Sequence, residues 1–307
     1  MDKKKKKLSP LARFRGFIQA GATLLTNLHL PNFAKGALYQ GGGKYVCVPG
    51  LNCYSCPAAS GACPIGSFQA VVGSSKFRFS YYITGFLILL GVLLGRFICG
   101  FLCPFGWFQE LLHKIPTKKL STKKLKPLTY LKYAVLLVMV VLLPAFLVND
   151  VGMGDPFFCK YLCPQGVLEG AIPLSLANSG IRAALGSLFT WKFGILLAVI
   201  VLSVVFYRPF CKWLCPLGAF YALFNRVSLF QMKVDKNKCV SCGKCARACK
   251  MDVDVTKAPN HTECIRCGMC IRACPTNAVS FRYGFGDGKD KAKAAETLQT
   301  NNNNKEE

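Results

Sequence analysis

Eight of the eighteen cysteines in this 307-residue chain form two copies of one motif near the C-terminus. The copies read CVSCGKCARACK and CIRCGMCIRACP, so both have the spacing C-x2-C-x2-C-x3-C. Three thiolates at this spacing bind three corners of a cubane iron–sulfur cluster, and the fourth cysteine reaches the neighbouring cluster. The predicted ligands are Cys239, Cys242, Cys245 and Cys274 for one [4Fe–4S] cluster, and Cys264, Cys267, Cys270 and Cys249 for the other.

Zinc binding is the alternative interpretation of these two motifs. Zinc usually takes two C-x2-C pairs rather than three cysteines at this spacing. The iron–sulfur interpretation, which matches the pattern of bacterial two-cluster ferredoxins, is therefore favoured. The copies differ in one place, because Lys250 follows the fourth cysteine of the first copy where Pro275 follows that of the second. This replacement removes no ligand.

A second repeat, Cys-Pro-x-Gly, occurs four times in the rest of the chain. The copies are CPIGSFQ (63–69), CPFGWFQ (103–109), CPQGVLE (163–169) and CPLGAFY (215–221). In the last three copies another cysteine lies four residues earlier, at Cys99, Cys159 and Cys211, whereas in the first copy the preceding cysteine is Cys56, seven residues earlier. Repetition of this kind indicates a duplicated structural unit.

Each C-x3-C-P unit has the geometry of half a metal site. Cysteines four residues apart project from one face of a helix. Proline disfavours a helical conformation in the residue before it and suits the first position of a new helix. We therefore expect one helix to end near Cys103 and another to begin there, with the thiolate beside the N–H groups of the new helix. Two thiolates cannot complete a cluster, so two units must combine.

Long apolar runs predict that these units lie in a membrane domain. The chain is 52% hydrophobic, and three runs have the roughly 20 residues needed to cross the hydrocarbon layer, namely 80–98, 130–148 and 189–207. A fourth run at 12–30 carries two arginines, a glutamine and an asparagine. An amphipathic helix at the membrane surface is therefore an alternative to a fourth span.

The basic residues predict the orientation of these spans. The chain has 39 Lys and Arg against 14 Asp and Glu, a net charge of +25. They flank the apolar runs, which argues against a nucleic-acid partner and for cytoplasmic loops. Residues 1–15 hold seven Lys or Arg and 114–126 hold six, whereas 35–79 hold four and 149–188 only two. Four spans with both termini in the cytoplasm satisfy every loop of such a multi-pass cell-membrane protein.

This topology pairs the half-sites. The predicted inner-face site consists of Cys99, Cys103, Cys211 and Cys215. On the outer face, repeat symmetry favours a cluster bound by Cys56, Cys63, Cys159 and Cys163, leaving Cys47 and Cys53 as a disulfide or as competing ligands. A rival grouping uses Cys47, Cys53, Cys56 and Cys63 alone, and structural disulfides in an oxidising compartment are a further alternative.

The predicted fold is mostly α and has four parts. These are a basic cytoplasmic N-terminus (1–11), a four-helix integral membrane domain (12–230), a two-cluster ferredoxin-like α+β domain (231–284) and a disordered tail (285–307). No nucleotide-binding glycine loop, nucleophile elbow or C-x-x-C-H haem motif occurs in the sequence. We therefore expect no catalytic residues, and an electron-transfer subunit of an oxidoreductase system rather than a stand-alone enzyme.

Four spans, the units CGFLCP and CKWLCP, and the paired C-terminal motifs together resemble the membrane polyferredoxins of the NapH type. The membrane part of NosR is similar, and the resemblance covers about residues 10–283. It implies electron transfer between a quinol or cytoplasmic donor and an extracytoplasmic redox partner, with a quinol or flavoprotein as candidate partners. A maturation factor for a partner metalloenzyme and a redox sensor acting on a regulator are alternative functions for the same clusters. The cysteines of CVPGLNCYSCPAASGACP and CKYLCP depart from the basic pattern of the family.

Overall fold

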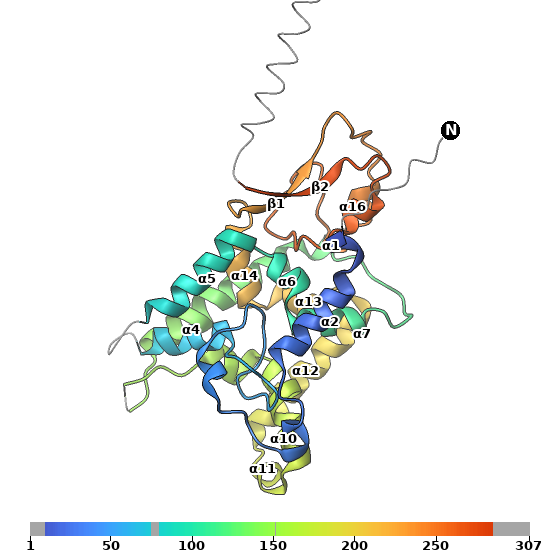
Figure 1. Ribbon diagram of the computed structural model, residues 1–307. Coiled ribbons are helices and arrows are strands. Elements are labelled where there is room, and N and C mark those ends of the chain that lie inside the picture. The colour runs from blue at the N-terminus through green and yellow to red at the C-terminus, as the bar shows by residue number, and fades with distance from the viewer. Residues whose placement is uncertain (1–9, 75–79, 151, 285–307) are drawn as a thin grey trace, which may run out of the picture.

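The computed structural model describes residues 10–74, 80–150 and 152–284, and helices dominate it (Figure 1). The first helices are α1 (Pro10–Arg13), α2 (Arg15–Thr26), α3 (Asn32–Lys35), η1 (Gly42–Tyr45), α4 (Pro64–Gly73), α5 (Tyr81–Leu94), α6 (Phe97–Phe101) and α7 (Pro104–Leu112). The next are η2 (Lys123–Tyr130), α8 (Leu131–Val135), η3 (Leu136–Leu142), α9 (Leu143–Phe146), η4 (Phe158–Leu162), η5 (Gly166–Ala171), α10 (Ile172–Ala177), α11 (Ser179–Ala183), α12 (Ser187–Val205), α13 (Pro209–Trp213) and α14 (Pro216–Phe224). The predicted disordered tail and all but two residues of the predicted basic N-terminus lie outside the described residues.

The C-terminal part is a small α+β unit built around two strands. β1 (Phe230–Val234) pairs antiparallel with β2 (Val279–Tyr283), and the short helices α15 (Lys244–Arg247) and α16 (Met269–Ala273) lie between them in the sequence. Met232, Ile271 and Val279 pack together in its core. The mostly helical fold with a C-terminal α+β unit agrees with the predicted fold class.

Two stretches of helix in the described part of the chain are long and apolar enough to cross a membrane. They are Leu125–Phe146, which runs from η2 to α9, and α12. The other two predicted spans contain shorter helices, since α5 has 14 residues and α2 has 12. α5 ends because Gly95 adopts a positive φ of 54°, and a Cβ there would lie 2.7 Å from Nη1 of Arg266. The four-span arrangement remains a prediction.

Proline starts a helix directly after the last cysteine of three repeat units. α4, α7 and α14 begin at the prolines that follow Cys63, Cys103 and Cys215, and each cysteine has an extended backbone conformation. This conformation is the one that a following proline favours. The helix break expected at Cys103 is thus confirmed, since α6 ends at Phe101.

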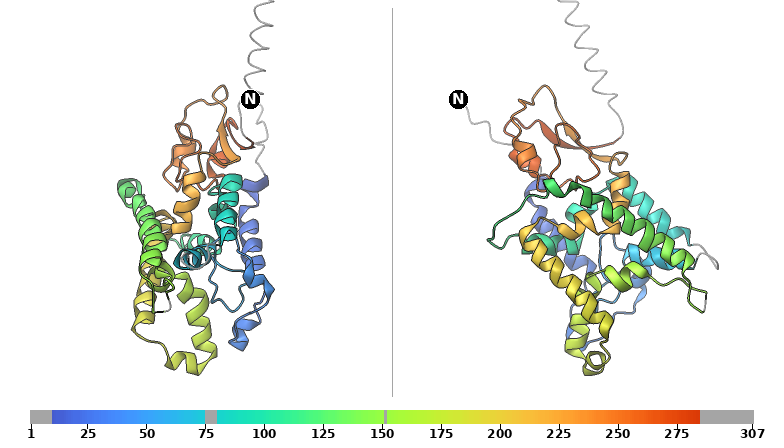
Figure 2. Two further views of the ribbon diagram at one scale, coloured as in Figure 1. Left: turned by 90° about the vertical axis from the view of Figure 1, so that its left-hand side faces the viewer. Right: turned by 180° about the vertical axis from the view of Figure 1, so that it is seen from behind.

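The C-terminal unit covers one end of the helical domain, and α10 and α11 form the opposite end (Figures 1 and 2). α1 reaches the C-terminal unit, where a Cβ added to Gly268 would lie 2.7 Å from Cβ of Ala12. One buried apolar core continues across this junction, from Cys63 through Cys103 to Ile265. The predicted membrane domain and the predicted ferredoxin-like domain are therefore packed as one body.

Candidate iron–sulfur sites

Two pockets in the C-terminal unit are lined by cysteines of both motifs. Ferredoxin site 1 is lined by Cys239, Cys242, Cys245 and Cys274. Ferredoxin site 2 is lined by Cys249, Cys264, Cys267 and Cys270. Each pocket therefore brings together three cysteines of one motif and the fourth cysteine of the other, which is the exchange that the spacing predicts.

Backbone geometry aims donors at the sulfur atoms of these pockets. Gly243 and Gly268 adopt left-handed conformations at the starts of α15 and α16, within the cysteine motifs. The backbone N–H of Ala278 donates to Sγ of Cys274 at 3.3 Å. Burial alone would raise the pKa of Cys274, but this bond and those from Thr276 and Val279 lower it overall. Such donors stabilise thiolate, the form that binds iron.

The donor sets suit a cluster better than a single ion. Within the described ranges, no three His, Cys, Asp or Glu side chains converge closely enough to hold one metal ion. The four thiolates of a [4Fe–4S] cluster bind four different iron atoms, so they stand further apart than the ligands of one ion. Pockets lined by four thiols, with amide donors facing the sulfur, fit that requirement.

The inner site is a fully buried group of thiols from two distant segments. Its members are Cys99, Cys103, Cys211 and Cys215, none more than 8% exposed. Burial, followed by the nearby charges of Cys211 and Cys99, raises the pKa of Cys103 to about 12. Burial also raises the pKa of Cys215, and the charges of Cys211, Cys99 and Cys103 contribute. The four cysteines predicted for the inner face therefore lie together.

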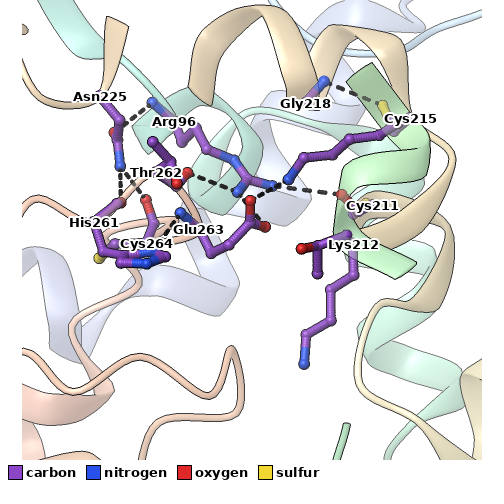
Figure 3. Close-up of polar contacts among 12 residues, drawn as sticks. Arg96, Cys211, Lys212, Cys215, Gly218, Asn225, His261, Thr262, Glu263 and Cys264 are labelled. Carbon is purple, nitrogen blue, oxygen red and sulfur yellow. Dashed lines mark hydrogen bonds and ion pairs between the residues drawn. The ribbon is translucent and has the colours of Figure 1, made fainter. Parts of the chain in front are cut away.

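Two amide donors face the sulfur atoms of the inner site. Nε2 of Gln109 donates to Sγ of Cys211 at 3.1 Å, while its Oε1 accepts the N–H of Phe210 at 3.2 Å. The backbone N–H of Gly218 donates to Sγ of Cys215 at 3.4 Å (Figure 3). Hydrogen bonds of this kind to ligand sulfur stabilise negative charge on a bound cluster.

Two completely buried arginines add positive charge beside the inner site. Arg96 lies between Cys211, whose carbonyl accepts from Nη2 at 3.4 Å, and Glu263, whose Oε2 accepts from Nη1 at 2.9 Å (Figure 3). Arg208 donates to the carbonyl of Cys99 and forms an ion pair of 3.0 Å with Glu110. When a cluster is bound, these cations would offset the charge of its four buried thiolate ligands, which would otherwise be costly.

The carboxylate of Glu110 balances Arg208 on the side away from the thiols. Burial alone would raise its pKa, but Arg208 and Arg15, followed by a hydrogen bond from Tyr207, lower the pKa to about 2. Glu110 is therefore ionised at neutral pH. It holds Arg208 in place between the carboxylate and the cysteine backbone.

Ferredoxin site 2 packs directly on the inner site. A Cβ on Gly100, between Cys99 and Cys103, would overlap the carbonyl oxygen of Ile265, between Cys264 and Cys267. Nδ2 of Asn225 donates to the carbonyl of Cys264 at 2.9 Å (Figure 3). Only glycine allows the two cysteine motifs to approach this closely.

Cys63, Cys159 and Cys163 also lie together, and the fourth thiol beside them is Cys53. Burial raises the pKa of Cys163 well above its ordinary value, and the charges of Cys159, Cys53 and Cys63 contribute. We call these four residues the outer site. Nε2 of Gln69 donates to Sγ of Cys159 at 3.1 Å, as Gln109 does to Cys211 in the inner site.

The remaining two cysteines contact other residues. Cys56, which repeat symmetry favours as a ligand, packs with Ala58 and Ala59 and lies 3.5 Å from Oδ1 of Asn27. Cys47 lies 3.6 Å from Oγ of Ser67. All eighteen cysteines are within the described residues, and none forms a disulfide there.

One loop connects the inner and outer sites. Hydrogen bonding from the backbone of Leu51 opposes the raised pKa of Cys103, and that of Asn52 does the same for Cys63. Only one residue step, about 3.8 Å between Cα atoms, separates the two amides. Buried Tyr221 also lies between the sites: burial raises its pKa, and charges of both sites raise it further. The two sites are therefore close neighbours.

Several of these residues were missed in the sequence analysis. The glutamines at the ends of CPIGSFQ and CPFGWFQ were visible in the repeat, because both stand six residues after the cysteine. Arg96 and Arg208 lie at the ends of two predicted spans, where a sequence pattern alone suggests interfacial anchors. Nothing in the repeat spacing distinguishes Cys53 from Cys56.

Sites built from cysteine thiols alone and supplied with amide donors define an iron–sulfur protein. Family comparison agrees with this class. A model described as 4Fe-4S binding domain matches residues 61–82, 79–123, 132–172 and 188–237, and a second model with that description matches 232–253 and 258–280. The chain belongs to this family of 4Fe-4S binding proteins.

Several curated proteins are similar to the chain. An uncharacterized protein of Methanocaldococcus jannaschii is 32% identical over 65% of this chain and 77% of its own length. Ferredoxin-type protein NapH of Haemophilus influenzae is 28% identical over 36% of this chain and 52% of NapH. YccM of Escherichia coli, named as an electron transport protein, is 26% identical over 55% of this chain and 45% of YccM. No solved structure matches the chain.

These relatives confirm the resemblance to NapH-type proteins. NosR of Stutzerimonas stutzeri, named a regulatory protein, is also similar, with 28% identity over 52% of this chain and 21% of NosR. The chain is accordingly an iron–sulfur electron-transfer protein of the ferredoxin type that binds [4Fe–4S] clusters. It spans about half or less of NapH, YccM and NosR.

Proposed function

We propose that the protein relays electrons through a membrane, between a cytoplasmic donor and a redox partner on the other side, using four [4Fe–4S] clusters. When bound, each cluster supplies a one-electron carrier. The observation that carries the proposal is the order of the cysteine sites. Ferredoxin site 1, ferredoxin site 2, the inner site and the outer site follow one another, each in contact with the next.

Three contacts support this order. The two ferredoxin sites exchange Cys249 and Cys274 between their motifs. Gly100 brings the inner site against the motif of ferredoxin site 2. Leu51 and Asn52 face a thiol of the inner site and a thiol of the outer site. The protein's part is to hold the four sites close together and to keep water away from the inner two.

Exposed apolar helices support a membrane location. In the most apolar windows of Leu125–Phe146 and α12, only 22% and 17% of residues are buried. A core helix of a water-soluble protein would bury most of such a surface. Phe17 of α2 and Tyr81 of α5 are 80% and 79% exposed, so the two shorter helices also carry outward apolar residues. We therefore propose four membrane-embedded segments.

The charged segments support the proposed orientation. α1 follows the N-terminal lysines and touches α16, while Oγ of Ser121, in the basic loop 114–126, lies 3.2 Å from Oδ1 of Asp252. Ala12 of α1 and Ser121 of the loop thus adjoin the ferredoxin unit, which agrees with a common cytoplasmic side for the described parts of both basic segments. We propose that a quinol or flavoprotein donates electrons at that side.

A vesicle assay tests the relay. The anaerobically purified protein is reconstituted in sealed lipid vesicles with ferricyanide trapped inside, and dithionite is added outside. The proposal predicts that the protein speeds the reduction of trapped ferricyanide at least tenfold over empty vesicles. Replacing Cys103 and Cys215 of the inner site by alanine should remove this gain, because the row of sites is interrupted.

Two results would contradict the relay. One is a rate equal to that of empty vesicles for a protein that carries all of its iron. The other is an unchanged rate in the Cys103→Ala/Cys215→Ala variant. A variant of the exposed pair Asp235 and Lys238, Asp235→Asn, serves as the control and should transfer electrons at the unaltered rate.

A further inference from the structure

The outer site lacks one cysteine that the repeat pattern would otherwise provide. In the other three units a cysteine stands four residues before the Cys-Pro pair, but in the first unit that position is Ala59. Ala59 is completely buried and packs with Cys56. The missing thiol must therefore come from outside the repeat if this site is to have four ligands.

We infer that Cys53 takes the place of the missing cysteine, so that Cys53, Cys63, Cys159 and Cys163 bind the fourth cluster and Cys56 is not a ligand. The inference rests on the proposed function, since it completes one of the four sites. Two independent contacts assign Cys53 to this position.

The first contact involves the glycines of the two facing units. A Cβ on Gly66, in the unit of Cys63, would lie 3.8 Å from Sγ of Cys159. A Cβ on Gly166, in the unit of Cys163, would lie 3.7 Å from Sγ of Cys53. Cys159 and Cys53 therefore occupy matching places, each against the glycine of the opposite unit.

The second contact involves the residue six positions after each Cys-Pro cysteine. Gln109 and Gln69 accept the N–H of the residue just before Cys211 and Cys159, at 3.2 and 3.0 Å. In the unit of Cys163 this position is Glu169, whose Oε2 accepts the N–H of Cys53 at 3.0 Å. Glu169 is a positioning residue that fixes Cys53 by its backbone.

Cys56 contacts other residues. It packs with Ala58 and Ala59, and its Sγ lies 3.5 Å from Oδ1 of Asn27. Its backbone carbonyl accepts from Nζ of Lys44 at 3.5 Å. These neighbours belong to neither of the two facing Cys-Pro-x-Gly segments.

With this assignment, each of the eighteen cysteines is either a cluster ligand or a buried thiol. Sixteen provide four ligands to each of four clusters, and Cys47 and Cys56 remain as buried thiols. Cys53 lies outside every segment that matches the 4Fe-4S binding family. Family resemblance alone would therefore leave this site with three ligands.

Two matched substitutions test the assignment in the full-length, anaerobically purified protein. Cys53→Ala should lower iron and acid-labile sulfide by about one quarter, four of about sixteen iron atoms. Cys56→Ala, three residues away and more deeply buried, should leave both unchanged. Cys159→Ala is the positive reference. Unaltered electron paramagnetic resonance signals of the two ferredoxin clusters show that each variant is folded.

Two serine variants add a second measurement, the midpoint potential of each cluster, which would not change if Cys53 served only to pack the site. Serine can keep a cluster bound through oxygen, so Cys53→Ser should shift the midpoint potential of one cluster, while Cys56→Ser shifts none. The inference is overturned if Cys53→Ala keeps full iron or if Cys56→Ala loses a cluster. Wild-type protein with only about eight iron atoms would instead refute the proposed membrane-domain clusters, before any variant is compared.

Discussion

The two ferredoxin sites take most of their cysteines from short local motifs, whereas the inner and outer sites combine cysteines from segments that are far apart in the sequence. A ferredoxin site takes three cysteines from one short motif, and in ferredoxin site 1 one of them, Cys242, is exposed. The inner site joins cysteines more than 100 residues apart, and all four are buried. A local motif positions most of the cysteine ligands of its site by itself. An assembled site depends on every element that holds its halves together.

This difference explains where the charged residues lie. In ferredoxin site 1, water can solvate the thiolate of exposed Cys242. The buried inner site has Arg96 and Arg208 at its edge, and each arginine is paired with a carboxylate on its far side. Removing a charge should therefore harm the assembled sites much more than the local ones.

Glu263→Gln should have the largest effect on stability. The carboxylate pairs with Arg96 and Lys132, both completely buried, at the junction between the two kinds of site. Loss of a buried partner costs about 3–5 kcal/mol, so we expect a clearly lower thermal unfolding midpoint and easier proteolytic release of the ferredoxin unit. Asp235→Asn, in an exposed pair, should change neither. Equal midpoints for both variants would show that the junction is not held by these charges.

Acidification should act next most strongly, through Glu110. The folded pKa of about 2 lies below the unfolded value of about 4.3, so its stabilising contribution is complete above about pH 5 and is lost as the pH falls towards 2. This contribution is about 3 kcal/mol. Glu110→Gln should lower the unfolding midpoint at pH 7, and the difference from wild type should shrink between pH 5 and pH 3. A constant difference would contradict the assigned pKa.

Two glutamine variants distinguish the assembled sites from each other. Gln109→Leu removes a hydrogen bond to Cys211, and Gln69→Leu removes one to Cys159. Each change should cost about 1–3 kcal/mol and should lower the midpoint potential of one cluster, because a hydrogen bond to sulfur favours the reduced form. A redox titration monitored by electron paramagnetic resonance should show that a different cluster is affected in each of the two variants. A common shift would mean that the sites are not separate.

Tyr221→Phe should have the smallest effect. The hydroxyl donates to the carbonyl of Pro49 at 3.1 Å, and its loss costs about 1 kcal/mol. The ring keeps its place between the assembled sites, so iron content and the vesicle transfer rate should stay within twofold of wild type. A tenfold slower rate would show that the hydroxyl itself, rather than the closeness of the sites, matters for transfer.

The same contrast decides how much of the molecule the sequence could predict. The ferredoxin ligands follow from spacing within twelve residues, and the structure brings the predicted sets together. The inner site could be paired because its two units share a motif and follow similar apolar runs. Both predictions rest on information that is periodic or local.

The outer site and the linking loop show where such information ends. Cys53 and Cys56 are three residues apart in an irregular loop. Neither a helical nor a strand period therefore identifies which of the two is the ligand. Sequence reasoning also separated the inner and outer sites onto opposite membrane faces. The structure brings both to Leu51 and Asn52, because the segment after α3 folds back against the helical domain, where a Cβ on Gly50 would lie 2.8 Å from Cα of Cys103.

Iron and sulfide analysis of the anaerobically purified full-length chain, combined with a redox titration followed by electron paramagnetic resonance, tests the central claim most directly. The account predicts about sixteen iron atoms per chain, four for each cluster, and magnetic interaction between the clusters of the inner and outer sites. About eight iron atoms, with signals from the two ferredoxin clusters only, would contradict it.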